Sequence, residues 1–272
     1  MINKKIDIWE GLNYNNYGRS DFRPTMDTYI LDGNKKRSAV LIIPGGGYEF
    51  TSDREAEPIA MKYNAAGFNA FVLYYSVAPA KHPQPLLDAA RAITIIRENA
   101  EEWNIDGNKV VVCGFSAGGH LAAHLGVHWD KEYLFKIKGI KKGMTNPNAL
   151  ILSYPVITSG EYAHGGSFDA LLGKDPSKEL LEEVSLENEV SEKTPKTFIW
   201  HTFEDGCVPM ENSMMFVSAL RKFNIPFEMH IYPTGGHGLS LATEETNEDG
   251  TQLNLHVSSW MKLSIDWMKS QL

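Results

Sequence analysis

Cysteine, long apolar runs and positive charge are all scarce in this chain of 272 residues. The two cysteines, Cys113 and Cys207, lie at the ends of predicted strands that one further strand separates. That spacing places them about 9–10 Å apart, too far for a disulfide. We therefore expect two reduced thiols, as is usual in the cytosol. No apolar run approaches the roughly 18 residues of a membrane helix. These scarcities argue against a disulfide scaffold and against a membrane span.

Basic residues are outnumbered, with 26 Lys and Arg against 34 Asp and Glu, and the formal net charge is −8. Such a surface repels nucleic acid and anionic membranes, so we expect neither as a partner, whereas a small neutral molecule is not repelled. The first residues, MINKKIDIWEG, hold no apolar core of the kind that a signal peptide needs, and we expect a cytoplasmic protein. The length fits one large α/β domain over residues 1–272.

The chain does contain a regular alternation of short apolar runs and longer amphipathic segments. The apolar runs predict strands at residues 28–31, 38–43, 69–75, 109–114, 149–155, 197–202 and 227–232. The amphipathic segments predict helices at residues 54–67, 85–103, 116–128, 210–223 and 255–272. Because several strands are apolar at nearly every position, we expect a mostly parallel sheet covered by helices on both faces, a three-layer α/β fold.

The segment 158–190 departs from this alternation. It lies between two predicted strands, it is too long for a simple connection, and its second half is highly charged. We interpret it as a helical insertion or lid over the functional site; the alternative is an ordinary excursion with one or two short helices.

A G-x-S-x-G motif, GFSAGGH at residues 114–120, falls between a predicted strand and a predicted helix. This is the context of a nucleophile elbow, in which Gly114 and Gly118 omit side chains that would collide across a strained turn. Ser116 would then stand at the carboxyl end of a central strand, where the following helix terminus favours negative charge. Ser116 is therefore the candidate nucleophile; the alternative is a chance match in a glycine turn.

A base and an acid follow later in the chain. His237 lies in the glycine-rich stretch YPTGGHGLS, after a predicted strand, where small neighbours leave room for an imidazole. Asp205 lies just beyond another predicted strand, in WHTFEDGCVP, and can orient that imidazole. Glu204 is adjacent but fits the loop position less well. The order Ser116, Asp205, His237 is that of the α/β-hydrolases.

Three glycines end the apolar strand in LIIPGGGY, residues 41–48. Backbone N–H groups of such a turn, together with the N–H of the residue after the nucleophile, form an oxyanion hole in esterases. The donors here would be Gly45 or Gly46, with Ala117. Pro44 replaces the histidine of the lipase-type motif, and the alternative is a flexible loop.

The remaining histidines are candidates for metal ligands, pocket residues or structural residues. One helix carries histidines at i, i+4 and i+8, but no H-E-x-x-H glutamate accompanies them, so we expect core or rim residues and no metal. These are His120, His124 and His128. His201, at a strand end, is expected to be structural. Tyr48 and His164 are candidates for the substrate pocket.

Several stretches together resemble one known family. They are LIIPGGGY, PLLDAARAITIIRENAEEWNID, KVVVCGFSAGGHLAAHLG, LSYPVITSGEYAHGGSFDALLG, HTFEDGCVPMENSMMFVSAL and GGHGLS. From about residue 38 to its end, the chain is similar to the bacterial α/β-hydrolase esterases grouped with acetyl xylan esterases and feruloyl-esterase-like hydrolases. The resemblance implies a Ser116–Asp205–His237 triad and an oxyanion hole from the PGGGY and FSA backbones.

The expected function is hydrolysis of short-chain acyl esters, most of all acetyl groups on xylo-oligosaccharides or related sugars, without a cofactor. The lack of a leader favours imported oligosaccharides over polymer. A carboxylesterase for longer acyl chains or a peptidase remains an alternative, because pockets on this fold vary. A non-catalytic binder is a third hypothesis, disfavoured by the complete set of three residues. The sequence leaves open whether the chain forms a homo-oligomer.

Overall fold

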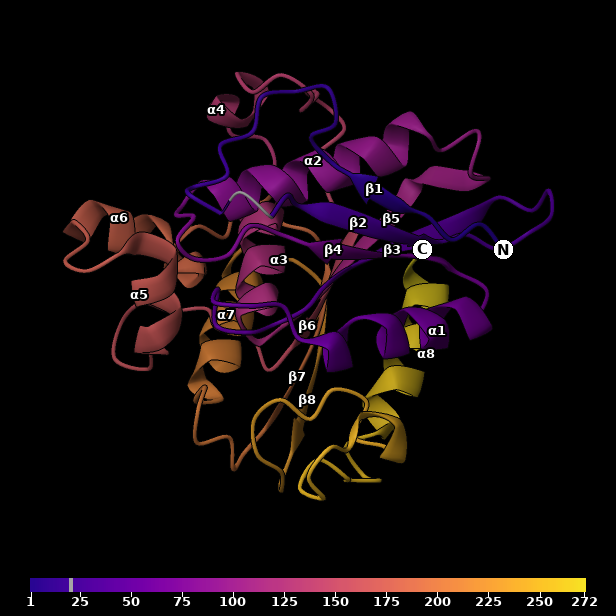
Figure 1. Cartoon of the computed structure of the whole chain (residues 1–272). Helices are drawn as coiled ribbons and strands as arrows, with labels where there is room; N and C mark the ends of the chain where they lie inside the picture. Colours follow the sequence, from indigo (N-terminus) through magenta and orange to yellow (C-terminus); the bar gives the residue numbers. More distant parts are fainter. Residues whose placement is uncertain (20–21) are drawn as a thin grey trace.

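The computed structural model describes residues 1–19 and 22–272, and its centre is an eight-stranded sheet in the order β1-β2-β4-β3-β5-β6-β7-β8 (Figure 1). Six neighbouring strands, from β4 to β8 in that order, run parallel, while β1 and β2 extend one edge antiparallel. The strands are β1 (Lys5–Asp7), β2 (Thr25–Tyr29), β3 (Arg37–Ile43), β4 (Asn69–Tyr74), β5 (Ile105–Phe115), β6 (Ala149–Ser153), β7 (Thr197–Thr202) and β8 (Phe227–Tyr232).

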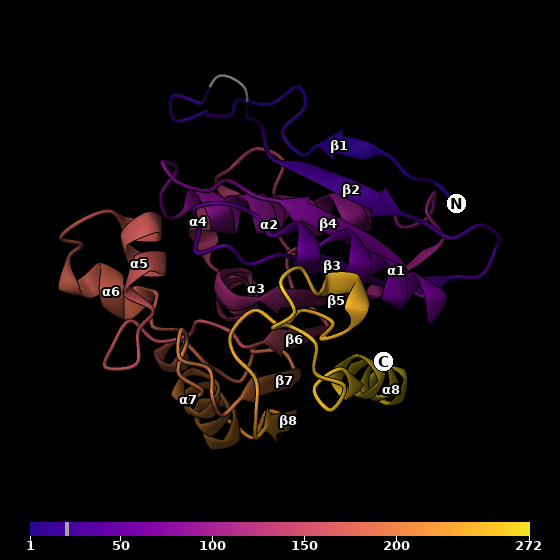
Figure 2. The same ribbon diagram turned by 60° about the horizontal axis from the view of Figure 1, so that its bottom comes forward.

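Helices cover both faces of the sheet, which gives the three layers that Figure 2 shows. One face is covered by α1 (Glu57–Ala65) and α8 (Ser259–Gln271). The other is covered by α2 (Gln84–Glu98), α3 (Ser116–His128) and α7 (Glu211–Lys222). The short α4 (Glu132–Phe135) follows α3.

The apolar character of the central strands explains this layering. Along β3, Leu41 and Ile43 join the core under α2 and α3, while Val40 and Ile42 join the core under α1 and α8. Successive strand residues point to opposite faces, so a strand that is apolar throughout needs a helix layer on each side. The predicted mostly parallel, doubly covered α/β sheet is confirmed.

The predicted strand boundaries agree closely for four of the strands, and the central strand β5 is longer than predicted. The predicted bounds of β7 and β8 match the observed ones, and β3 and β4 differ by one residue. The strand β1 was not predicted, because three residues carry no periodic signal and the strand depends on pairing with β2.

Three predicted helices are clearly shorter or divided, and one of them, predicted at 85–103, ends at Glu98. The predicted helix 54–67 is a 3-10 turn, η1 (Asp53–Glu55), followed by α1, because the backbone of Ala56 is not helical (φ −107°, ψ −106°). The predicted helix 255–272 begins only at Ser259. Gly67, with φ +96°, follows the end of α1 in the left-handed conformation that glycine commonly adopts after a helix.

The segment 158–190 contains α5 (Gly165–Leu172), α6 (Lys178–Glu183) and the 3-10 turn η2 (Leu186–Asn188). Its helices α5 and α6 stand at the left edge of the molecule in Figures 1 and 2. The segment is anchored at its start, where Asn212 of α7 accepts the N–H groups of Ile157 and Thr158 and donates to Tyr162 O. The segment, called the insertion, therefore consists of two short helices and a 3-10 turn packed on the body of the fold.

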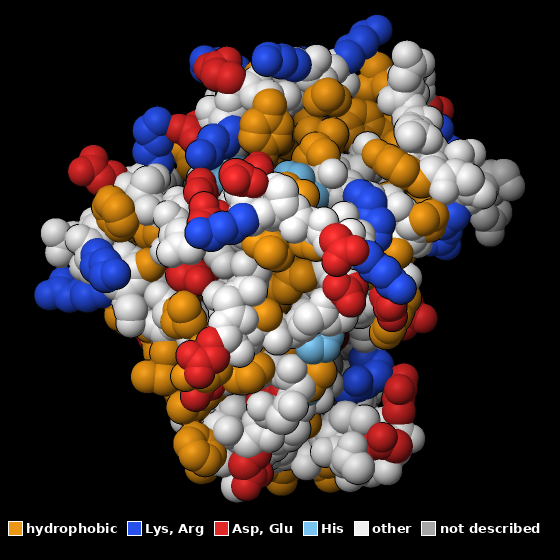
Figure 3. All heavy atoms as spheres, turned by 90° about the vertical axis from the view of Figure 1, so that its left-hand side faces the viewer, with side chains coloured by type: hydrophobic (Ala, Val, Ile, Leu, Met, Phe, Trp, Pro, Cys, Tyr) orange, Lys and Arg blue, Asp and Glu red, His pale blue; other side chains and the backbone are white. Residues whose placement is uncertain are grey.

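Charged side chains of both signs are mixed on the face that carries α5 and α6 (Figure 3). Over the residues that the structure describes, no helix combines the length and apolarity that crossing a bilayer requires. Cys113 is a buried free thiol and Cys207 an exposed one.

Candidate active site

Ser116 stands at the junction of β5 and α3 with a left-handed backbone, φ +52°. Such a conformation is strained for a side chain other than glycine and is retained where the surroundings enforce it. The two flanking glycines permit the turn. A Cβ on Gly114 would lie 2.2 Å from Gly118 O, and a Cβ on Gly118 would lie 2.2 Å from Ile43 O. The motif therefore forms the strand–serine–helix elbow that the sequence predicts.

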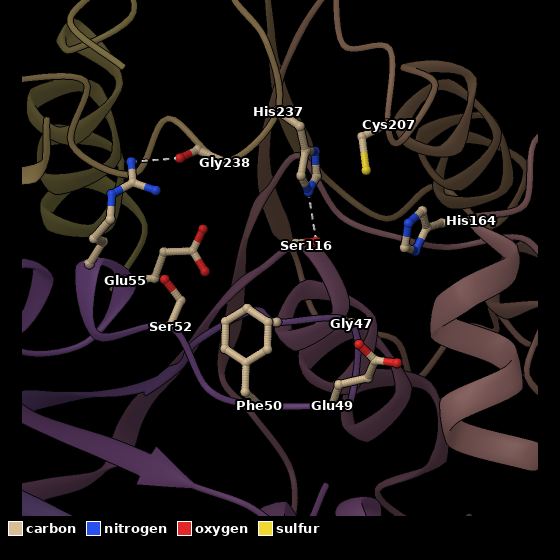
Figure 4. Close-up of a pocket in the computed structure, with 12 residues that line it drawn as sticks. Gly47, Glu49, Phe50, Ser52, Glu55, Ser116, His164, Cys207, His237 and Gly238 are labelled. Atoms are coloured by element: carbon tan, nitrogen blue, oxygen red, sulfur yellow. Dashed lines mark hydrogen bonds between the residues drawn. The ribbon is translucent and has the colours of Figure 1, made fainter. Parts of the chain in front are cut away.

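The structure brings Ser116, His237 and Asp205 together from three strand ends. His237 Nε2 lies 2.8 Å from Ser116 Oγ, and His237 Nδ1 lies 2.7 Å from Asp205 Oδ2 (Figure 4). Because a carboxylate can only accept, Nδ1 carries the ring proton and Nε2 is left to accept from the serine hydroxyl. The arrangement can remove the proton of Ser116 as its oxygen attacks.

Asp205 is 6% exposed and fully hydrogen-bonded. Its Oδ1 accepts the N–H groups of Cys207 and Val208. Burial by itself would raise the pKa of the Asp205 carboxyl, but the hydrogen bonds from His201 and His237 and the nearby N–H groups hold that pKa well below its usual range. Asp205 is therefore ionised beside the imidazole. Glu204 instead accepts the N–H of Gly235 and does not reach His237.

The glycine turn after β3 lies beside the elbow. The Gly45 N–H donates to the Glu55 carboxylate at 2.7 Å, so it is already engaged. Gly46 and Gly47 line the cavity, and Gly45 does not. Ala117 is the second residue of α3, and N–H groups in the first turn of a helix have no partner within that helix. Of the predicted donors, Gly46 and Ala117 retain N–H groups for an incoming anion.

An open cavity of about 320 Å³ lies over Ser116 and His237. In Figure 4, Ser52 and Glu55 lie on one side of the serine and His164 and Cys207 on the other, with Phe50 and Glu49 beneath. The lining residues are Gly46, Gly47, Glu49, Phe50, Ser52, Arg54, Glu55, Ser116, His164, Cys207, His237 and Gly238. His164 is the one lining residue that comes from the insertion, so the insertion contributes a wall of the cavity.

Tyr48, a predicted pocket residue, does not line this cavity. It is 2% exposed, and its hydroxyl bonds to Nδ1 of His120 at 2.7 Å. Its backbone is left-handed, φ +62°, at the end of the glycine turn. The placement corrects the prediction: Tyr48 is a core residue beneath the site, whereas its exposed successors Glu49 and Phe50 reach the cavity.

Glu55 is a site residue that the sequence did not indicate. It falls within a predicted amphipathic helix, where an acidic residue is ordinarily exposed, yet it is 3% exposed and lies next to Ser116. Arg54, beside it, donates to Gly238 O and Thr246 O and so ties this turn to the loop of His237. Only the tertiary packing identifies either residue.

The histidines of α3 are buried core residues, as predicted. His120 bonds to Val184 O and His128 to Glu189, both near the end of the insertion. His201 is also buried and hydrogen-bonded, with Ser213 Oγ on one ring nitrogen. Within the described residues, no three His, Cys, Asp or Glu side chains are grouped so as to hold a metal ion.

The mostly parallel eight-stranded sheet, with a serine elbow at the end of β5, defines an α/β-hydrolase fold. Within that class, the chain belongs to the BD-FAE family, whose model matches residues 26–220.

The chain is similar to two curated relatives in sequence and to two solved structures in fold. It is 43% identical to endo-1,4-β-xylanase B of Butyrivibrio fibrisolvens over 88% of its length and 32% identical to an acetylxylan esterase of Xylanibacter ruminicola over 86%. It spans only 38% and 47% of those two proteins. An acetyl ester-xyloside bifunctional hydrolase of Caldicellulosiruptor lactoaceticus superposes with a TM-score of 0.87 at 42% identity, covering 98% of this chain and 96% of the other. A carboxylesterase of Lactobacillus plantarum gives 0.83 at 25% identity, with coverages of 100% and 98%.

Proposed function

We propose that the chain is a serine esterase that hydrolyses short-chain acyl esters, chiefly acetyl esters on xylo-oligosaccharides or related sugars. The main support for the proposal is that hydrogen bonds link Ser116 to His237 and His237 to Asp205, and that this linked set faces an open cavity. The acetylxylan esterase and the acetyl ester-xyloside hydrolase among the relatives support the class of substrate.

In the acylation half-reaction, Ser116 Oγ attacks the ester carbonyl carbon while its proton passes to His237 Nε2. The carbonyl oxygen becomes an oxyanion, which the N–H groups of Gly46 and Ala117 receive. Asp205 stabilises the imidazolium. The imidazolium then protonates the sugar oxygen as the C–O bond breaks, which frees the sugar hydroxyl and leaves an acyl-serine.

Water completes the cycle. It attacks the acyl carbon while one of its protons passes to His237 Nε2, and a second oxyanion forms in the same place. The bond to Ser116 Oγ breaks, and the proton on His237 returns to that oxygen. One ester and one water give one carboxylic acid and one alcohol, and the protein's own side chains carry every proton without a cofactor.

The walls of the cavity support a sugar as the alcohol half of the ester. Phe50 is 59% exposed at the cavity and offers an apolar ring face to the C–H face of a pyranose. The exposed Glu49 carboxylate can accept hydrogen bonds from hydroxyl groups. His164 Nδ1 accepts from Ser167, so in the neutral ring Nε2–H is a donor. Burial lowers the pKa of His164, which favours that neutral ring. One aromatic face, one acceptor and one donor suit a polyhydroxylated ring.

The size of the cavity supports a short acyl group. About 320 Å³ lies at the low end of the roughly 300–1,000 Å³ that ligand pockets span. A sugar residue against Phe50 would take up part of this volume, which favours an acetyl or propionyl group over a long acyl chain. A carboxylesterase for longer chains needs an additional apolar channel.

The decisive experiment compares initial rates on aryl esters from acetate to laurate for the wild type, Ser116→Ala and Ser52→Ala. Ser52 lines the same cavity, and its hydroxyl has no partner among the described residues. We expect acetate and propionate to be preferred, Ser116→Ala to lower kcat by about a thousandfold or more, and Ser52→Ala to stay within about threefold.

Acetate release from acetylated xylo-oligosaccharides then tests the sugar. Phe50→Ala should raise KM for the sugar ester more than KM for the aryl ester. A preference for long acyl chains would indicate the carboxylesterase alternative. If Ser116→Ala kept more than about a tenth of the wild-type rate, the proposed role of that serine would be wrong.

A further inference from the structure

Glu55 is a buried carboxylate that contacts two parts of the site at once. Its Oε2 accepts the N–H of Gly45 at 2.7 Å, and its Oε1 accepts the hydroxyl of Tyr154 at 2.6 Å. Gly45 is the first residue of the glycine turn, and a Cβ there would lie 2.8 Å from Glu55 Oε2. The carboxylate therefore fits closely against the turn whose next residue, Gly46, faces the cavity.

Tyr154 connects Glu55 to the loop that carries His237. Its hydroxyl donates to Glu55 and accepts the N–H of Ser240 at 2.9 Å. Its fully buried ring packs edge-on against His237, with centroids 5.0 Å apart and an interplanar angle of 70°. The Tyr154 side chain thus supports both the imidazole and the backbone three residues after it.

The short turn η1 reinforces the same connection. Ser240 Oγ donates to Arg54 O at 2.6 Å, and the Arg54 guanidinium donates to Gly238 O at 2.9 Å. Residues 54 and 55 therefore hold the glycine turn on one side and the loop of His237 on the other.

A carboxylate is a costly residue for this position if the fold alone is considered. Burial raises the pKa of Glu55 even though the hydrogen bonds from Tyr154 and Gly45 act in the opposite direction. Taking a charge out of water rarely adds net stability compared with a well-packed neutral side chain. The contacts of Glu55 are instead those of a residue that orients its neighbours.

We propose that Glu55 is a positioning residue. It holds the oxyanion turn and the catalytic histidine in fixed positions relative to each other, on either side of Ser116. This inference rests on the proposed esterase function. With Gly45 N–H held by the carboxylate, the Gly46 peptide is left to face the cavity. With Tyr154 held by the same carboxylate, the His237 ring keeps its distance from Ser116 Oγ. Preorganised donors and a fixed base lower the transition-state barrier without tighter substrate binding.

The test uses Glu55→Gln and Tyr154→Phe, with Asp53→Asn as the matched control. Gln has one acceptor oxygen and no charge, so it cannot accept from Gly45 and Tyr154 on separate oxygens as the carboxylate does, while Phe keeps the ring on His237 and loses only the hydroxyl. Asp53 belongs to the same turn, but its side chain is exposed.

On aryl acetate we expect Glu55→Gln to lower kcat by about ten- to a hundredfold with KM within about threefold of wild type. Tyr154→Phe should lower kcat in the same way, and the double variant should be little worse than Glu55→Gln alone, because both act through one connection. Asp53→Asn should match the wild type.

The outcomes separate the two proposals. If Ser116→Ala abolishes hydrolysis but Glu55→Gln and Tyr154→Phe keep wild-type kcat, the positioning role is wrong and the esterase stands. If kcat falls only in step with the melting temperature, Glu55 is merely structural and the inference is wrong. If the wild type shows no serine-dependent hydrolysis of any ester, both fall.

Discussion

At Asp205, one carboxylate oxygen lies near two imidazoles. Oδ2 is 2.7 Å from His237 Nδ1 and 3.2 Å from His201 Nε2. His201 is fixed by Ser213 Oγ on its other nitrogen and by Val208 O. The acid is therefore held by a structural histidine while it orients the functional one.

We expect Asp205→Asn to lower kcat by about 10³–10⁴ while the fold is kept, because an amide at this place favours the wrong tautomer of His237. Glu204→Gln is the control, since its amide oxygen can still accept from Gly235 N–H. Steady-state rates on aryl acetate, with melting temperatures measured in parallel, check both. Equal losses in the two variants would contradict the choice of Asp205 as the acid.

The motifs around Ser116, Asp205 and His237 indicate these three residues from the sequence, and the structure brings them together. Glu55 and Tyr48 could not be assigned in this way. Whether an acidic or aromatic side chain faces a cavity or the core depends on local backbone turns, here the non-helical Ala56 and the left-handed Tyr48. No short-range pattern encodes those turns.

At the level of the elements, the backbone packs too closely for any side chain at Gly114 and Gly118. These two positions lie where β5, the elbow and α3 meet β3. A Cβ on Gly118 would lie 2.2 Å from Ile43 O and 2.3 Å from Pro44 O, both backbone atoms of β3 and its end. Backbone cannot move aside as a flexible side chain can.

We therefore expect Gly118→Ala to displace the elbow from β3 and to lose most soluble expression or activity. Gly107→Ala, in β5, is the control, because its Cβ would meet only Ala100 Cβ at 3.9 Å. Expression yield, melting temperature and aryl-acetate rate measure the contrast. A Gly118→Ala protein as stable and active as Gly107→Ala would show that the close packing is not needed.

A ladder of histidine rings, with one stacked pair and two edge-to-face pairs, joins α3 to the insertion. Neighbouring ring centroids lie 4.7–5.7 Å apart. Its members are His82, His120, His124 and His128. Glu183 and Glu189 of the insertion approach the two ends, and Lys131 pairs with Glu189. Burial lowers the pKa of each ring, to about 4 for His120, so all four are neutral in the folded state near neutral pH.

Lowering the pH should therefore destabilise the contact that these histidines make between α3 and the insertion. A histidine whose pKa is lowered by folding binds fewer protons when folded than when unfolded, so stability falls as the pH drops below about 6.5. For His120, the change from the ordinary value to about 4 costs about 2 kcal/mol at about pH 5. We expect the free energy of unfolding in denaturant to decrease between about pH 7 and about pH 5.

The variant His124→Leu should show a weaker decrease, because His124 Nε2 has no hydrogen-bond partner among the described residues and leucine does not titrate. Leu255→Gln, a substitution at a highly exposed position that removes no titratable group, is the control and should keep the wild-type slope. If His124→Leu kept the full slope as well, the ladder would not be the source of acid sensitivity.

For the molecule as a whole, every central strand contributes to both cores. Each core contains tryptophans, whose fluorescence can therefore follow the unfolding of both cores. Trp9 and Trp103 lie in one core, and Trp200, Trp260 and Trp267 lie in the other. Neither core can open without exposing residues of the shared strands, which makes unfolding cooperative.

We expect thermal unfolding of the full chain to give one midpoint whether it is followed by far-UV circular dichroism or by tryptophan fluorescence. This tests the prediction that residues 1–272 form one domain with the segment 158–190 as part of it. Two separate transitions would show that the insertion or the amino-terminal strands unfold independently.

The sequence alone determined the layered sheet and the chemical identity of the three site residues. Apolar periodicity and glycine spacing act over a few residues, and both can be read from the chain directly. Only the tertiary structure decided that Gly45 N–H is bound to Glu55, that Tyr48 belongs to the core and that His164 from the insertion forms a wall of the cavity. Those facts depend on contacts between residues far apart along the chain, and such contacts exist only once the strands and loops have been brought together.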